Sequence, residues 1–167
     1  MKKLFFALIA GTFFLQACEG PVGPPGPAGT DGLRGQVHEV QATFNAANKY
    51  GADFDFKGKA LGEGDKVVGF ILEGEDNQGN DNWEPLPQTF FDKGNTFVYT
   101  FNFSITGFTI FLDGNADLGT LASDKRTNRI FRMLVVPGKL VNKVNLKDMK
   151  DIMAKTGVQE SDINVIF

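Results

Sequence analysis

The residues with the clearest spacing for metal chemistry lie in one loop. Asp113, Asn115 and Asp117 occupy alternate positions, and Asp124 follows eleven residues after Asp113. Oxygen side chains at alternate positions can point at one hard cation, and the last of them matches the final ligand position of a twelve-residue calcium loop. However, Leu118 stands where such loops have glycine, and Asx-rich loops commonly bond their own backbone. The four residues are candidate calcium ligands, and the sequence favours the competing interpretation of a solvated turn.

A second candidate site is centred on Trp83, the single tryptophan of the chain. An exposed indole can stack on a sugar ring, and the neighbouring Asp81 and Asn82 can bind its hydroxyl groups. Asp81 and Asn82 end a hydrophilic stretch over 73–82 that matches no metal-ligand spacing, and Trp83 directly follows it. They are candidate glycan-binding residues, and the competing interpretation is a half-buried tryptophan at the start of a strand.

No catalytic constellation accompanies these candidates. The chain has one histidine, His38, and one cysteine, so the sequence gives neither a nucleophilic triad nor a zinc pattern. We interpret His38 as a partly exposed strand residue. Lys125, Arg126, Arg129 and Arg132 are interpreted as a solvated basic group. The chain is predicted not to be an enzyme and to need no cofactor, with calcium as the one alternative.

The N-terminus predicts export. Lys2 and Lys3 precede an uncharged run from Leu4 to Leu15, which is shorter than the roughly 20 residues that a membrane-spanning helix needs. The next residues, Leu15-Gln16-Ala17-Cys18, resemble the lipobox of bacterial lipoproteins. That resemblance implies cleavage before Cys18, a diacylglycerol on its thiol and a fatty acyl chain such as palmitate on the new amine. The alternative is an ordinary signal peptide that leaves a free thiol.

Glycine then recurs every third residue from Gly20 to Gly35, with prolines at 21, 24, 25 and 27. This is a collagen-like pattern, because only glycine fits at the axis of three polyproline-type strands. A homotrimer through this segment is one interpretation. We prefer a monomer in which the segment is a stiff spacer of about 45 Å, at ~3.1 Å per residue.

The rest of the chain is patterned as β-structure. Removal of Lys2 and Lys3 with the leader leaves 15 basic against 20 acidic residues, so nucleic acid is not an expected partner. Alternating or continuous apolar runs predict strands near residues 40–44, 54–56, 65–73, 83–91, 96–104, 108–112 and 129–136. The prolines at 85 and 87 place the fourth of these at a sheet edge.

The C-terminal residues change to a helical period. A helix is predicted from an Asn145 cap to Gly157, followed by an extended segment over 163–167 that packs back on the sheet. The predicted fold is therefore mainly β: an antiparallel β-sandwich of about seven strands, with one C-terminal helix covering one end. A barrel is the alternative. The expected domains are a lipoprotein signal peptide at 1–17, a lipidated Cys18 and collagen-like spacer at 18–35, and the β-sandwich at 36–167.

In this order of parts the chain resembles the small collagen-like lipoproteins common in Bacteroidota. The segments at 83–91, 111–115 and 129–132 are similar to segments of that group, although a Gram-positive collagen-like lipoprotein would share the lipobox and the triplets. The resemblance implies an outer membrane location in a Gram-negative cell envelope, and it implies no mechanism, because the group has no assigned activity. We therefore expect a lipid-anchored, non-catalytic protein that presents its β-sandwich for binding or structural contacts with a glycan or an envelope protein. The alternative is a calcium- or glycan-dependent adhesion module.

Overall fold

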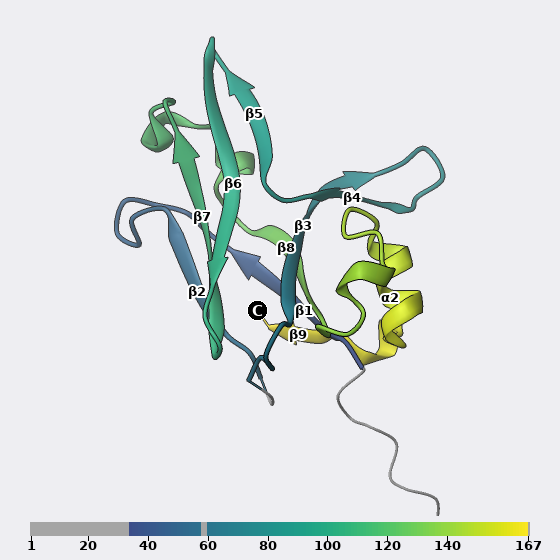
Figure 1. Ribbon diagram of the computed structural model, residues 1–167. Helices are drawn as coiled ribbons and strands as arrows, with labels where there is room; N and C mark the ends of the chain where they lie inside the picture. Colours follow the sequence, from purple (N-terminus) through teal and green to yellow (C-terminus); the bar gives the residue numbers. More distant parts are fainter. Residues whose placement is uncertain (1–33, 58–59, 167) are drawn as a thin grey trace, which may run out of the picture. The chain divides into compact units, whose positions relative to one another are not determined.

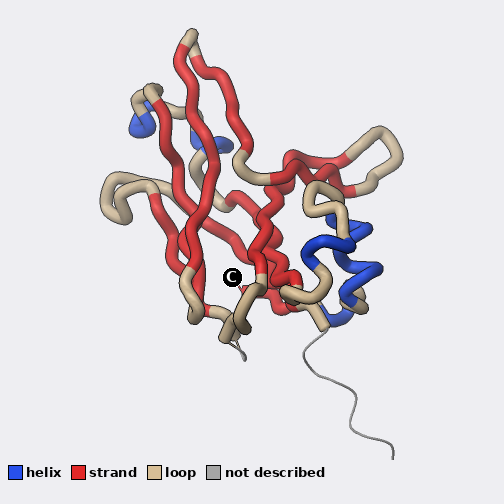
Figure 2. Tube along the Cα trace, in the orientation of Figure 1, coloured by secondary structure: helices blue, strands red, loops and turns tan. Residues whose placement is uncertain are grey.

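The computed structural model describes residues 34–57 and 60–166. The signal peptide, Cys18, the triplets before Arg34 and Phe167 lie outside the described residues. Within them the chain forms one α-helix and nine strands (Figures 1 and 2). The strands are β1 (Gln36–Ala42), β2 (Gly51–Asp55), β3 (Lys66–Glu75), β4 (Asp81–Pro85), β5 (Gln88–Asp92), β6 (Asn95–Phe103), β7 (Gly107–Gly114), β8 (Arg129–Val136) and β9 (Asn164–Ile166), and the helix is α2 (Met149–Thr156).

The strands form two sheets. A five-stranded sheet has the order β4-β3-β8-β1-β9, and a four-stranded sheet has the order β2-β7-β6-β5. All neighbouring strands are antiparallel except β1 and β9, which run parallel. The prediction of a mainly β fold with a C-terminal helix is thus confirmed, whereas the strand number and the uniformly antiparallel pairing are corrected.

The two sheets share one core. Its buried residues come from both sheets, as Val40 and Phe131 do on one side and Phe97 and Ile110 on the other. Side chains on β6 alternate, because successive residues of a strand point to opposite faces. Phe97 and Tyr99 are buried and their neighbours are half-buried, as expected from the sequence. Phe103, at the end of the same stripe, is 45% exposed.

Helix α2 covers the outer face of the five-stranded sheet (Figure 1). A second core unites Phe70 of β3 and Leu134 of β8 with Ile152 and Met153 of the helix. The helix was expected at one end of the sandwich, and the reason for the difference is visible in β8. The last six residues of β8 are all buried, because both faces of this strand are covered. An apolar strand with no alternation needs a layer on each side.

The expected single strand over 83–91 is two strands. β4 ends at Pro85 and β5 begins at Gln88, and each lies at the edge of a different sheet. Proline lacks the N–H that a ladder requires, so the chain leaves one sheet at Pro85 and joins the other after Pro87. The edge position was therefore predicted correctly, but the crossing between sheets was not.

The helix begins later than expected. Asp148, and not Asn145, is its N-cap, and the Asp148 carboxylate accepts a hydrogen bond from the backbone N–H of Asp151. The predicted end is confirmed, since Gly157 adopts the left-handed conformation at φ 69° that glycine tolerates best.

Candidate functional site

A pocket lies between β4 and the start of α2. Its volume is about 480 Å³, and Phe70 of β3 is among the residues that line it. One side is made by Asp81, Asn82 and Trp83, the three residues that the sequence singled out as candidate glycan ligands. The structure thus places all three in one pocket, and their binding of a ligand stays a prediction.

The other side of this pocket comes from the segment that leads into α2. Its side chains are mostly polar or charged, and no sequence pattern linked them to Trp83, because more than sixty residues separate them. The contributing residues are Asn145, Lys147, Asp148, Met149 and Lys150. The packing of α2 on the outer face of the five-stranded sheet brings the two segments together.

Short-range hydrogen bonds fix the backbone of the α2 side. Asn145 Oδ1 accepts from the Lys147 N–H at 3.1 Å, and Asp151 Oδ2 accepts from the Asn145 N–H at 2.7 Å. The hydrogen bond from Asn145, with help from Lys155, lowers the pKa of Asp151. Within the described residues no carboxylate lies within ion-pair distance of Lys147 or Lys150. Both lysines are exposed and line the pocket.

Arg132 supports Trp83. Its guanidinium carbon lies 4.5 Å from the centre of the indole ring, a cation–π arrangement. Glu39 Oε2 accepts from Arg132 Nε at 2.8 Å, and Glu160 pairs with the same guanidinium at 3.0 Å. Arg132 is only 9% exposed and does not line the pocket. The expectation that Arg132 belongs to a solvated basic group is therefore wrong.

The hairpin turn before β4 holds the β4 side in place. Asp76 Oδ1 accepts from the N–H groups of Gln78 and Asn80, and Asp76 Oδ2 accepts from the Asn80 side chain at 3.0 Å. The bond from the Asn80 side chain is the main cause that lowers the pKa of Asp76. The connection between the strands is thus hydrophilic, as expected, but it covers only 76–80 and not 73–82, because β3 continues to Glu75 and β4 begins at Asp81.

The candidate calcium ligands are engaged with local groups. Asp113 Oδ1 accepts from the Gly114 N–H at 2.7 Å, and Asp117 Oδ1 accepts from the Gly119 N–H at 3.0 Å. Asn115 Oδ1 accepts from the Thr96 N–H at 2.7 Å, and Asp124 pairs with Lys125 at 3.4 Å. In the described part of the chain, no three His, Cys, Asp or Glu side chains are grouped closely enough to hold a metal ion. The structure therefore does not assemble these carboxylates, and calcium binding here stays a prediction.

His38 lies in the core between the sheets, so its interpretation as partly exposed is wrong. Its side chain is 0% exposed, and in the described structure neither ring nitrogen has a hydrogen-bond partner. The rings of Phe56 and Phe108 lie 5.4 Å and 6.4 Å from the imidazole. Burial lowers the pKa of His38, because the charged form loses its hydration. The parity that His38 shares with the buried Val40 is the sequence signal that could have indicated this inward orientation.

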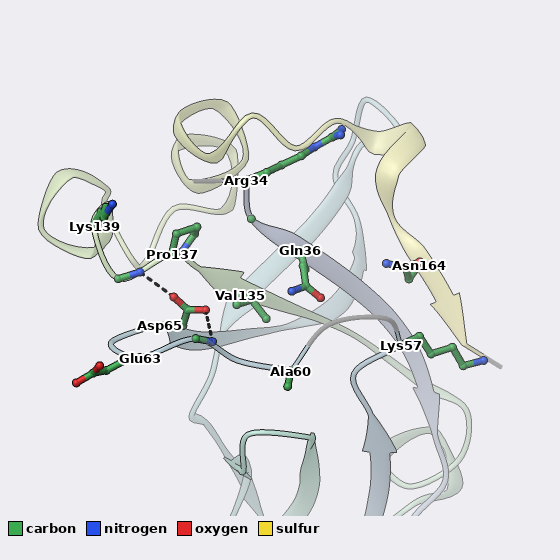
Figure 3. A pocket seen from close by; sticks show the side chains of 13 residues that line it. Arg34, Gln36, Lys57, Ala60, Glu63, Asp65, Val135, Pro137, Lys139 and Asn164 are labelled. Carbon is green, nitrogen blue, oxygen red and sulfur yellow. Dashed lines mark hydrogen bonds between the residues drawn. The ribbon is translucent and has the colours of Figure 1, made fainter. Parts of the chain in front are cut away.

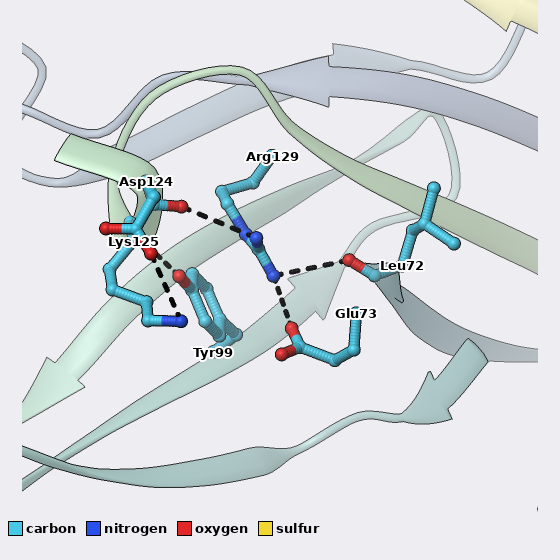
Figure 4. A network of polar contacts seen from close by, with 6 residues as sticks. All are labelled: Leu72, Glu73, Tyr99, Asp124, Lys125 and Arg129. Carbon is cyan, nitrogen blue, oxygen red and sulfur yellow. Dashed lines mark hydrogen bonds and ion pairs between the residues drawn. The ribbon is translucent and has the colours of Figure 1, made fainter. Parts of the chain in front are cut away.

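Arg129 belongs to a network at the edge of the sandwich core (Figure 4). Its guanidinium pairs with Glu73, donates to the Leu72 carbonyl at 3.3 Å and lies 5.6 Å from the centre of the Tyr99 ring. Tyr99 donates to the Lys125 carbonyl, and burial raises the pKa of Tyr99 to about 12. These contacts join strands of both sheets, so Arg129 has a structural role and is not a solvated cation.

A larger pocket of about 580 Å³ lies where the chain enters β1 (Figure 3). Asp65 in its wall accepts from the N–H groups of Gly62 at 2.8 Å and Gly138 at 2.9 Å. The Arg34 guanidinium is paired with Asp162 at 2.6 Å. Asp65 and Arg34 thus already have partners within the chain, and none of the described residues that line this pocket is aromatic. The pocket beside Trp83 is the better candidate site.

Three comparisons with known proteins found no protein similar to this chain. No family model matches the sequence, and neither the curated proteins nor the solved structures give a significant match. Among the described residues, the structure has no helix with the length and apolar character to cross a bilayer.

Proposed function

We propose that this protein is a lipid-anchored cell-envelope protein that displays a non-catalytic β-sandwich on a collagen-like spacer for binding. The observation that carries the proposal is the sequence Leu15-Gln16-Ala17-Cys18 directly after a short apolar leader. A lipid on the thiol and an acyl chain on the amine give firm anchoring, since each buried methylene contributes about 0.8 kcal/mol. The location expected from the family resemblance is the outer membrane of a Gram-negative cell.

Membrane fractionation tests the anchor. The full chain should sediment with membranes, should be released by detergent and should incorporate an alkyne-tagged fatty acid. Cys18→Ser should abolish the incorporation and move the protein out of the detergent-released fraction. Thr30→Ser, a conservative change within the spacer, is the matched control and should behave as the unmodified chain does. Lipid incorporation that persists in Cys18→Ser would overturn the proposal.

The second candidate function is a glycan-dependent adhesion module. The observation that favours it is the common pocket of Asp81, Asn82 and Trp83 beside the start of α2. Adhesion to glycan-coated beads tests this candidate when the full chain is displayed on cells. Cells that carry Asp81→Ala should bind fewer beads than cells that carry Asp92→Ala, a change in β5 outside the pocket. Equal binding by the two variants would argue against the module. Calcium-dependent adhesion is tested by the same assay with and without a calcium chelator.

A further inference from the structure

We propose that the pocket between β4 and the start of α2 binds a saccharide, with Trp83 as its apolar wall and the polar residues that lead into α2 as its opposite side. This inference rests on the proposed binding function, and it names the ligand class. The pocket has a volume of about 480 Å³, within the roughly 300–1,000 Å³ range of small-molecule sites. One or two sugar rings fit a pocket of this size.

The chemical types around the pocket match a polyhydroxylated ring. A sugar presents an apolar face of C–H groups and an edge of hydroxyls that both donate and accept. Trp83 is half-buried against the second core, as the competing interpretation expected, and the part of its ring that lines the pocket offers aromatic surface to the first. Asp81 and Asn82 would accept from the second. Lys147 and Lys150 add only donors, since an ammonium group has no acceptor.

The site is also organised before any ligand arrives. Arg132 holds the indole by cation–π contact and is itself held by Glu39 and Glu160. The Asn145 and Asp148 side chains fix the opposite backbone through hydrogen bonds to Lys147 and Asp151. A wall that is already rigid loses little conformational entropy on binding. Arg132 is therefore a positioning residue that acts through Trp83.

Because Trp83 is the single tryptophan of the chain, its fluorescence reports this pocket alone. The purified full chain in a detergent without a sugar headgroup is titrated with a neutral hexose oligomer and, separately, with a uronic acid oligomer. We expect a saturable change in emission with at least one of them. If the uronate binds and its affinity falls as salt is added, its acid group is bound by Lys147 and Lys150. If both oligomers bind equally well, the affinity comes from stacking and hydroxyl contacts.

Exposed variants keep the test independent of folding. Asp81→Ala and Lys147→Ala should each weaken binding about tenfold, which corresponds to ~1.4 kcal/mol. Lys143→Ala, in the same segment but outside the pocket, is the matched control and should leave the affinity unchanged. Arg132→Met should shift the Trp83 emission maximum of the free protein and weaken binding, as a purely remote structural change would not.

Two results would overturn the proposal: no saturable change with either oligomer, or affinities that Asp81→Ala and Lys147→Ala leave intact. A flat titration together with intact lipid incorporation at Cys18 would refute the saccharide site and leave the anchor standing. The two proposals therefore fail separately.

Discussion

The two sheets of the sandwich differ in how many of their faces are covered. The five-stranded sheet is covered by the sandwich core on one face and by α2 with the C-terminal segment on the other. Within residues 34–57 and 60–166, the four-stranded sheet contributes buried side chains to the sandwich core alone. Accordingly β8 is buried at six consecutive positions, whereas β6 alternates. The pattern of apolar residues along a strand therefore indicates how many of its faces are covered, and not only that a strand is present.

The outer face of each sheet gives the largest predicted contrast. Leu134 on β8 is 1% exposed beneath α2, and Leu134→Ala should lower the free energy of unfolding by about 2–5 kcal/mol. Val98, on the outer face of the four-stranded sheet, is only half-buried, and Val98→Ala should cost less than about 1.5 kcal/mol. Urea unfolding of the two variants measures the difference. Equal losses would mean that the two outer faces are equally covered.

The core between the sheets should be sensitive to acid through His38. Its pKa is lowered from 6.5 in the folded protein, so the unfolded chain takes up a proton first as the pH falls. Stability should therefore decrease below pH 6.5, by up to about 1.4 kcal/mol per pH unit until the folded pKa is reached. Thermal unfolding between pH 7.5 and 5 checks this, and His38→Leu should flatten the dependence.

Three aspartates with lowered pKa values titrate in a lower range than His38. Hydrogen bonds hold the pKa values of Asp76, Asp151 and Asp162 below 3.8, so their contributions are lost only as the pH falls below about 4. A loss of stability between pH 7.5 and 5 that persists in His38→Leu would contradict the assignment.

The end of α2 should show a smaller effect. Gly157 has φ 69°, and an added Cβ would meet no atom within 4 Å. Gly157→Ala should therefore cost only the conformational penalty, about 1 kcal/mol. Gly79→Ala, at φ 80° with equally open surroundings in the β3–β4 turn, is the control for that penalty. A much larger loss in Gly157→Ala would show that the helix terminus also makes packing contacts.

The smallest effect is expected at Phe91, at the edge of the four-stranded sheet. This side chain is 82% exposed, and Phe91→Ser should change the free energy of unfolding by less than about 0.5 kcal/mol. Phe90, its neighbour with the opposite orientation, packs on the core beside Phe97 at 5.4 Å, so Phe90→Ser should cost clearly more. Chemical denaturation distinguishes the two, and a costly Phe91→Ser would indicate that this face is covered in solution.

Much of the fold was predictable because it is encoded locally. The Phe97 and Tyr99 alternation, the end of β8 before Pro137 and the Gly157 helix terminus each depend on neighbours in sequence. The chain crossing at Pro87 and the placement of α2 depend on contacts between distant residues, which no local pattern contains. The same limit applies to the pocket. Trp83 was identified from the sequence, but only the packing of sheet and helix brings Lys147 to the pocket and Arg132 to the Trp83 ring.

The position of β1 in its sheet has a mechanical consequence. β1 lies between β8 and β9, with seven residue pairs to the first and three to the second. In a protein tethered at Cys18, as proposed, tension enters the domain at the first residues of β1. The pull then acts on backbone hydrogen bonds to two neighbouring strands at once, instead of peeling away an edge strand. A domain built in this way resists extraction by force at the point where its tether is attached.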